Sequence, residues 1–384
     1  MKAFQKVLVY VEGKGLKRCS VLFDDKIRKI VKGRGVSKYA EKYELPKDAI
    51  VLPGFIDQHV HGAGGSDGMD GTVENIATIA NTLAAEGTTS FLVTTMTQSK
   101  ENITNALQAV SMYREKNPAQ GAKVVGVHLE GPFIAEKFKG AQPLEYVVAP
   151  DVATFNEYNE ASGNCIRIVT LAPEVSGALD LVAHLKKKGI VASIGHTGAK
   201  FADIQEAVKA GASNVTHTYN AQSPVHHREV GVVGSAMLCD ALYTELICDT
   251  IHVSIPAIKL LLRNKPQDKV ILITDSMRAK GLCDGISELG GQTVYVKNGE
   301  ARLENGALAG SVLRMNDAIR NLVEKVGVPF ETAVDFATVN PATHLGLAHE
   351  RGTIEVGKRA DFTVLDDAFN VLQTIVGGKT VFEK

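Results

Sequence analysis

Two histidines separated by a single residue, His59 and His61, stand at the end of an apolar segment that spans residues 55–61. Side chains two positions apart on a β-strand point to the same face, so both imidazoles can reach one metal ion. A single His-x-His pair is a weak signal on its own. Its meaning depends on which other metal-binding side chains lie near it.

Three further apolar segments end at or contain potential metal ligands, namely Glu130, His196 and His217. Four histidines and one carboxylate that meet at one rim suit Zn²⁺, or another divalent transition ion such as iron. The alternative is a set of hydrogen-bonded core histidines, which does not explain why they share segment ends. We therefore predict a metal site that contains these side chains.

An aspartate, Asp275, directly follows the apolar segment 270–274. A carboxylate beside a metal-activated water can accept the proton of that water and later pass it to a leaving group. The structural alternative is a buried carboxylate that is paired or caps a turn. We predict that Asp275 is the general base and then the general acid of a hydrolytic reaction.

The elements that carry these residues are apolar, strand-like segments that alternate with helical periodicity. Their starts are 24 to 42 residues apart, as repeated strand–helix units require. The eight segments are 55–61, 89–95, 124–130, 166–171, 190–196, 214–219, 244–249 and 270–275. We predict an α/β fold with a (β/α)8, TIM-like barrel, whose active site lies at the C-terminal ends of the strands. A doubly wound parallel sheet is the alternative.

Both ends of the chain consist of short β-like segments punctuated by glycine, without helical periodicity. Neither end can bury a core alone, so we expect the two to pair in a small β-sandwich domain. The predicted domains are residues 1–53 together with 346–384 for the sandwich, and 54–345 for the catalytic barrel.

The composition excludes several classes of protein. The formal net charge is −1, which gives no reason to expect nucleic acid or an acidic membrane surface as a partner. No apolar stretch approaches the length of about 18 residues that a membrane helix needs. The five cysteines are scattered and form no C-x-x-C pair, which indicates reduced thiols and a cytoplasmic protein.

Several sequence strings resemble a known family. PGFIDQHVH at 53–61 and GTIEVGKRAD at 352–361 are similar to the opening and closing motifs of the amidohydrolase superfamily. Within that superfamily, other strings resemble the N-acetylglucosamine-6-phosphate deacetylases. These are HLEGPF at 128–133, GHT at 195–197, THTYNA at 216–221, HHRE at 226–229, TDS at 274–276 and LAGS at 308–311.

The resemblance implies a metal-dependent hydrolase that removes the N-acetyl group of N-acetylglucosamine 6-phosphate, with Asp275 as the acid/base residue. It implies one or two ions per subunit, most simply zinc. Glu130, His196 and His217 hold the main ion, and His59 and His61 hold a second one that Glu130 bridges. It also implies a homodimer. The expected substrate-binding residues are Ala141, Gln142, Asn220, Ala221, Arg228, His252, Leu308, Ala309 and Gly310.

Two details of that expectation are specific to this chain. Arg228 is expected to contact the phosphate, and the resemblance leaves open whether it does so in the neighbouring subunit. At Gln142, some relatives of the family carry a histidine that polarises the substrate carbonyl. An amide can still donate a hydrogen bond there, so Gln142 is a candidate for the same role.

Rival functions make different demands on the sequence. A cyclic amidohydrolase needs a carboxylated lysine at the end of the fourth strand, and the segment 166–171 contains no lysine. An adenosine-deaminase-like enzyme does not account for Glu130. A non-catalytic binding module usually loses ligands, whereas the full set is present here. The glycine-rich string 62–68 lacks a third glycine in register and does not indicate a dinucleotide site.

Overall fold

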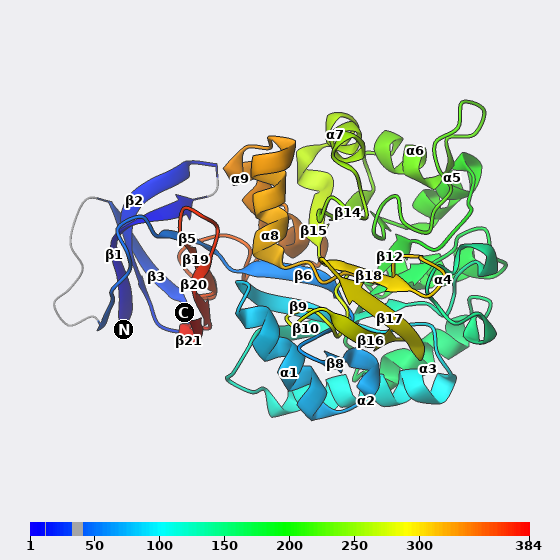
Figure 1. The fold of residues 1–384 in the computed structure, drawn as a ribbon, viewed down its shortest axis with the longest axis horizontal. Helices are drawn as coiled ribbons and strands as arrows, with labels where there is room; N and C mark the ends of the chain where they lie inside the picture. Colours follow the sequence, from blue (N-terminus) through cyan, green and yellow to red (C-terminus); the bar gives the residue numbers. More distant parts are fainter. Residues whose placement is uncertain (12, 33–40) are drawn as a thin grey trace.

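The computed structural model describes residues 1–11, 13–32 and 41–384, and its centre is a parallel barrel (Figure 1). Eight strands form it in the order β15-β14-β13-β12-β11-β10-β9-β6. The barrel closes where the His61 backbone N–H donates to the Ser276 carbonyl at 2.9 Å. The strands are β6 (Phe55–Val60), β9 (Thr88–Thr94), β10 (Lys123–Glu130), β11 (Ile166–Leu171), β12 (Val191–Ile194), β13 (Asn214–Val215), β14 (Tyr243–Ile247) and β15 (Val270–Ile273). The predicted fold class is confirmed.

Four of these strands, β12, β13, β14 and β15, end two or more residues before the predicted segment does. Segment 190–196 leaves the sheet after Ile194, and segment 214–219 leaves it after Val215. The reason is a change of backbone direction, because His196 and His217 have φ values of +48° and +29°. The left-handed region cannot continue a strand. Both histidines therefore stand just beyond the sheet rather than within it.

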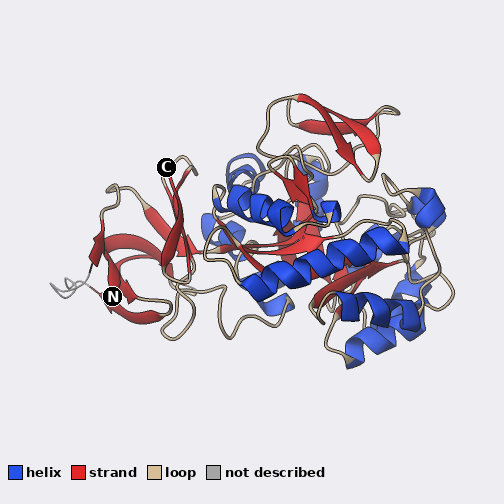
Figure 2. Ribbon diagram, turned by 90° about the horizontal axis from the view of Figure 1, so that it is seen from below, coloured by secondary structure: helices blue, strands red, loops and turns tan. Residues whose placement is uncertain are grey.

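Helices cover the outside of the barrel (Figure 2). In α1, the Thr72 side chain accepts from the Asn75 N–H and caps the helix, while Ile76, Ile79 and Leu83 face the core. The α-helices are α1 (Val73–Ala84), α2 (Lys100–Lys116), α3 (Val152–Ala161), α4 (Ala178–Lys187), α5 (Phe201–Ala210), α6 (Gly231–Leu238), α7 (Ile255–Asn264), α8 (Met315–Arg320), α9 (Phe330–Asp335) and α10 (Val339–His344). Shorter turns are η1 (Gly68–Asp70), η2 (Glu136–Phe138), η3 (Leu144–Tyr146), η4 (Gln267–Lys269) and the π-helical η5 (Asn321–Val326).

Within the described part of the chain, no helix has both the length and the apolar character needed to cross a bilayer.

The two ends of the chain build a second sheet, in the order β21-β20-β19-β5-β1-β2-β3 with β4 beside β1 (Figure 1). Rings of Phe23 and Phe362 lie 5.0 Å apart, although three strand spacings of about 4.8 Å separate β2 from β19 along the sheet. The sheet must therefore fold over onto itself around a phenylalanine core. Its strands are β1 (Lys2–Val11), β2 (Gly15–Phe23), β3 (Ile27–Lys32), β4 (Glu41–Tyr43), β5 (Ile50–Pro53), β19 (Phe362–Leu365), β20 (Val371–Val376) and β21 (Lys379–Glu383).

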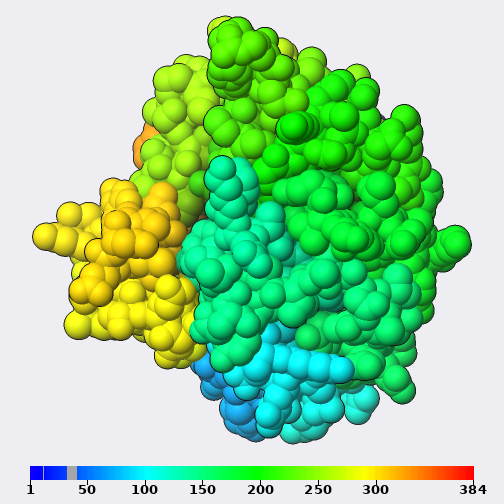
Figure 3. Space-filling model, turned by 90° about the vertical axis from the view of Figure 1, so that its right-hand side faces the viewer, coloured from blue at the N-terminus to red at the C-terminus, as the bar shows by residue number. Residues whose placement is uncertain are grey.

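A third sheet follows the eighth barrel strand and was not expected from the sequence. It consists of β16 (Gly285–Leu289), β17 (Gln292–Lys297) and β18 (Glu300–Leu303). Its inner face packs on Met96 and Met277 at the barrel mouth. In Figure 3 this segment, coloured yellow, projects beside the green part of the chain. A short ribbon, β7 (Gly62–Ala63) with β8 (Ser66–Asp67), follows β6.

Candidate active site

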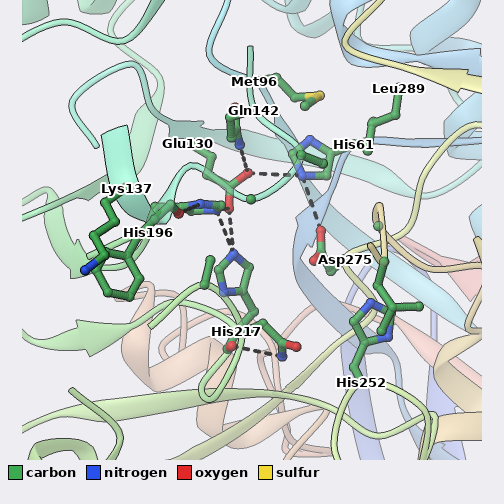
Figure 4. Close-up of a pocket in the computed structure, with 17 residues that line it drawn as sticks. His61, Met96, Glu130, Lys137, Gln142, His196, His217, His252, Asp275 and Leu289 are labelled. Atoms are coloured by element: carbon green, nitrogen blue, oxygen red, sulfur yellow. Dashed lines mark hydrogen bonds and ion pairs between the residues drawn. The ribbon is translucent and has the colours of Figure 1, made fainter. Parts of the chain in front are cut away.

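A cavity of about 440 Å³ opens at the C-terminal ends of the barrel strands. Figure 4 shows His61, Glu130, His196, His217 and Asp275 facing one another across it. They come from five different strand ends, as the barrel architecture predicts. The structure therefore brings the predicted metal ligands and the predicted acid/base residue into a single group, in which His59 Nε2 lies 3.4 Å from His61 Nε2.

Glu130 is the centre of the first group of ligands. Its Oε1 lies 3.0 Å from His217 Nε2 and 3.3 Å from His196 Nε2, and those two nitrogens are 3.1 Å apart. All three side chains are buried. Three donor atoms at mutual distances of this kind can bind one metal ion together.

The second group consists of His59, His61 and Asp275. Asp275 Oδ1 is 3.4 Å from His59 Nε2 and 3.2 Å from His61 Nε2. Glu130 joins the two groups, because its Oε2 lies 3.3 Å from His61 Nε2 while its Oε1 faces the first group. This arrangement provides two adjacent positions for a cation, with one carboxylate between them.

Hydrogen bonds on the far side of two imidazoles show which nitrogen faces the cavity. His59 Nδ1 lies 3.1 Å from Glu245 Oε2, and His196 Nδ1 lies 3.0 Å from the Phe138 carbonyl oxygen. Both partners are acceptors, so each Nδ1 carries a proton, and each imidazole when neutral has its lone pair on Nε2. Lone pairs and carboxylate oxygens that face each other need a cation between them, and the residues present therefore fit a divalent metal.

The electrostatics of the group support the same conclusion. Burial lowers the pKa of His61, but the hydrogen bonds and charges of Asp275 and Glu130 raise it to about 9. Burial raises the pKa of Asp275, but the charge of His59 and the hydrogen bond with His61 lower it to about 2. The buried carboxylates of Glu130 and Asp275 are therefore stabilised by nearby positive charge, which protons on the imidazoles or a metal ion can supply.

A glycine beside His196 permits the close approach of neighbouring strands. A Cβ atom on Gly195 would lie 2.7 Å from Thr216 Cβ and 2.8 Å from Thr170 Cγ2. A larger residue would push β12 away from its neighbours and move His196 with it. Glycine at this point therefore helps to place His196 against Glu130.

Gln142 reaches the first group from the loop after β10. Its Nε2 donates to Glu130 Oε2 at 2.9 Å, and its Oε1 accepts from the Thr97 N–H at 2.6 Å. The loop is also tied to the third sheet, because Gln292 Nε2 donates to the Ala141 carbonyl at 2.5 Å. The amide orientation is thus fixed by two neighbours, with its N–H₂ group directed into the cavity.

His252 stands on the other side of the cavity, where its Nδ1 lies 2.5 Å from Asp249 Oδ2. Burial lowers the pKa of His252, but the hydrogen bond and the charge of Asp249 raise it by more, so the pKa is above its ordinary value. Six of the other predicted substrate-binding residues line the same cavity, namely Ala141, Gln142, Asn220, Ala221, Leu308 and Gly310.

Two predicted substrate-binding residues lie elsewhere. Arg228 is exposed, its Nη1 is 2.7 Å from His227 Nε2, and it does not line the cavity of its own chain. Ala309 is buried in the apolar cluster under the third sheet, and its N–H donates to the Ala301 carbonyl. Ala309 therefore supports the loop that presents Leu308 and Gly310.

Sequence reasoning missed several residues of the site. Met96, Lys137 and Leu289 line the cavity, and Glu245 lies behind His59. Glu245 could have been noticed, because it is an acidic residue inside the apolar segment 244–249. Met96 and Leu289 carry no such signal, since apolar side chains near a strand end are ordinary core residues.

Comparison with known proteins places this site in a family. The profile of the Amidohydrolase family matches residues 50–381. A relative from Bacillus subtilis (strain 168), N-acetylglucosamine-6-phosphate deacetylase, is 43% identical over 361 residues, covering 94% of this chain and 91% of the relative. A relative from Escherichia coli O157:H7, N-acetylgalactosamine-6-phosphate deacetylase, is 37% identical over 334 residues, or 87% of this chain and 88% of that protein.

Solved structures are also similar to this chain over almost its full length. The crystal structure of N-acetylglucosamine-6-phosphate deacetylase from Pasteurella multocida superposes with a TM-score of 0.93 at 31% identity, covering 99% of both chains. A variant of the Mycobacterium smegmatis enzyme, solved in complex with N-acetyl-D-glucosamine-6-phosphate, has a TM-score of 0.92 at 29% identity, again over 99% of both chains.

Proposed function

The chain belongs to the amidohydrolase family, and on that premise we propose that it hydrolyses N-acetylglucosamine 6-phosphate to glucosamine 6-phosphate and acetate. The observation that carries the proposal is the convergence of Glu130, His196, His217 and Asp275 on one cavity. Relatives that match nearly the whole chain are deacetylases of this kind. The enzyme would serve amino-sugar metabolism.

A divalent metal bound by these ligands would lower the pKa of water towards 7 and polarise the amide carbonyl. Glu130, His196 and His217 would hold one ion, and His59 with His61 would hold a second. Zinc is the proposed metal, because imidazole nitrogens and a carboxylate are ligands that zinc accepts. The residues around the metal then determine which proton moves where.

Asp275 is the proposed acid/base residue. Its Oδ1 faces the same space as the ligand nitrogens of His59 and His61, and its low pKa keeps it ionised. Asp275 takes the proton of the attacking water and returns it to the amine nitrogen as the C–N bond breaks. Gln142 directs its N–H₂ group into the cavity, where it can donate to the developing oxyanion.

The phosphate end of the substrate would lie near His252, Asn220 and Ala221. His252 carries positive charge when protonated, and its raised pKa favours that state. Leu308 and Gly310 would contact the sugar. Arg228 lies outside the cavity of its own chain, so we propose that it reaches the phosphate of a neighbouring subunit in a homodimer. Arginine binds phosphate through its planar fork.

We also propose a cytoplasmic location. The expected substrate carries a phosphate dianion, which does not cross a bilayer unaided. The five cysteines are all free thiols, as expected for a reducing compartment.

The test is acetate release from N-acetylglucosamine 6-phosphate and from N-acetylglucosamine, with protein as purified, after removal of metal by a chelator, and after zinc is restored. Metal-dependent release that is much faster from the phosphorylated sugar supports the proposal. No release by folded, zinc-loaded protein contradicts it. N-acetylgalactosamine 6-phosphate belongs in the same assay because the 37% identical relative is named for that substrate.

A further inference from the structure

A fully buried glutamate on the seventh barrel strand, Glu245, lies behind the metal ligands and touches no part of the cavity. Its four partners come from β6, from β13 and from the segment that follows β13. Gln58 Nε2 donates to Oε1 at 2.7 Å and Asn214 Nδ2 donates at 3.2 Å, while His59 Nδ1 donates to Oε2 at 3.1 Å and the His217 N–H donates at 3.2 Å. A carboxylate accepts about four hydrogen bonds. Each carboxylate oxygen of Glu245 therefore accepts two hydrogen bonds, which is its full capacity.

The bond to His59 has a consequence for metal binding. An ionised carboxylate can only accept, so His59 must carry its proton on Nδ1 and offer the lone pair of Nε2 to the cavity. His61, the other ligand of the pair, has no described partner for its Nδ1. Within the His-x-His pair, the tautomer is thus fixed only at His59, and Glu245 fixes it.

The first group of ligands depends on Glu245 much less. His196 Nδ1 donates to the Phe138 carbonyl oxygen, and Glu130 is held by Gln142. His217 contacts Glu245 only through its backbone N–H. Any loss of the acceptor at position 245 should therefore affect the two metal positions unequally.

We propose that Glu245 is a positioning residue which fixes the Nδ1–H tautomer of His59 and thereby allows the His59–His61 pair to bind a second metal ion. The role requires a hydrogen-bond acceptor at this point and not a negative charge. It rests on the proposed function, since the metal belongs to that function.

Methionine and glutamine have side chains about as long as that of glutamate, and together they separate the need for a hydrogen-bond acceptor from the need for a negative charge. In Glu245→Met the acceptor is gone, and the His59 proton is free to move to Nε2, which then cannot bind metal. In Glu245→Gln the amide oxygen can still face His59 and the His217 N–H. The amides of Gln58 and Asn214 can turn over to accept from the new N–H₂ group, and Asn214 Oδ1 has no other partner among the described residues.

The measurement is titration of metal-free protein with ZnCl₂ in a calorimeter, with bound zinc counted by elemental analysis. Wild type should bind two ions. In Glu245→Met the second ion should bind about 10–100-fold more weakly, as is typical when a partner of a metal-binding histidine is lost. Glu245→Gln should bind the second ion nearly as well as wild type. The control is Gln58→Met, which removes another donor to Glu245 but leaves the His59 bond, and should still bind two ions.

Several results would overturn the proposal. They are binding of a single ion by wild type, two ions of unchanged affinity in Glu245→Met, or equal loss in the methionine and glutamine variants. If Glu245→Met does not fold, ¹⁵N–¹H correlation spectra of histidine-labelled, metal-free wild type decide the matter. They should show a proton on His59 Nδ1 at every pH, and a neutral His59 that carries its proton on Nε2 alone would contradict the proposal. Zinc binding without deacetylase activity would reject the proposed function and leave this inference standing.

Discussion

A buried ion pair between Lys280 and Glu86 should be essential for the stability of the barrel mouth. Lys280 Nζ lies 2.7 Å from Glu86 Oε1, and both side chains are almost completely buried, at 1% and 3% exposure. Lys280 Nζ is also 3.4 Å from Thr274 Oγ1, which donates to Asp57. The pair thus supports the residue immediately before Asp275. We predict that Lys280→Met destabilises the protein severely.

The magnitude follows from the geometry. At 2.7 Å and an effective dielectric constant of about 20, the attraction is about 6 kcal/mol. Much of this only offsets the cost of burying the two charges. Removal of one partner from a buried pair nevertheless costs about 3–5 kcal/mol, because the remaining charge stays buried without compensation. We expect a loss of that size for Lys280→Met at alkaline pH.

The loss should depend on pH in a defined direction. Burial raises the pKa of Glu86 while Lys280 lowers it, and the result is about 7, above the ordinary value of 4.5. A carboxyl group whose pKa is raised on folding stabilises the protein at low pH, and this contribution is lost as the pH rises through the folded pKa. Without Lys280 that pKa rises further, so the variant loses more stability than wild type above pH 7.

The assay is urea unfolding followed by circular dichroism at fixed zinc concentration, at pH about 6 and about 8.5, on either side of the Glu86 pKa. The matched control is Lys209→Met, which removes an ion pair of the same 2.7 Å length that is largely exposed. Such an exposed helical pair contributes only about 0.2–0.5 kcal/mol. Equal losses in the two variants, or a loss in Lys280→Met that does not grow with pH, would refute the reasoning.

Three further changes test the active site. Asp275→Asn should keep the ion held by Glu130, His196 and His217, seen by elemental analysis, but lower kcat by about 10²–10⁴-fold, and near-normal turnover would remove Asp275 from proton transfer. Gln142→Met should lower kcat/KM for the acetylated sugar phosphate, since the donor to Glu130 and to the substrate carbonyl is lost; unchanged kinetics would leave Gln142 with no role in the reaction. Arg228→Ala should raise KM for N-acetylglucosamine 6-phosphate and leave the unphosphorylated sugar unaffected, while equal losses on both substrates would argue against phosphate binding.

Much of the site could be predicted because a parallel barrel converts sequence position into spatial position. Each strand ends at the same rim, so polar side chains at the ends of apolar segments must meet. His61, Glu130 and Asp275 are predicted in this way, and the structure places His61 Nε2 3.3 Å from Glu130 Oε2 and 3.2 Å from Asp275 Oδ1. The domain boundaries at 53/54 and 345/346 stay a prediction, although the two terminal segments do share a sheet.

Residues that reach the site from loops could not be predicted in the same way. Gln142 and Leu289 are brought in by the segment after β10 and by the third sheet, whose path depends on tertiary contacts such as that between Gln292 and Ala141. Hydrophobic periodicity carries no information about such contacts. Arg228 illustrates the same limit, since its sequence motif does not indicate which subunit's cavity it would enter.

The strand ends reveal why the site needs a barrel to support it. His196, His217 and Asp275 have φ values of +48°, +29° and +49°, which residues with side chains rarely adopt. Such conformations persist only when the surrounding structure holds them. Here the Asp275 N–H donates to the His59 carbonyl, and the His217 N–H donates to Glu245. The bends turn three side chains towards one cavity, and neighbouring strands hold the bends at Asp275 and His217. The ligand positions are therefore set by the closed sheet as a whole, and a change that loosens one strand end should disturb metal binding before it unfolds the protein.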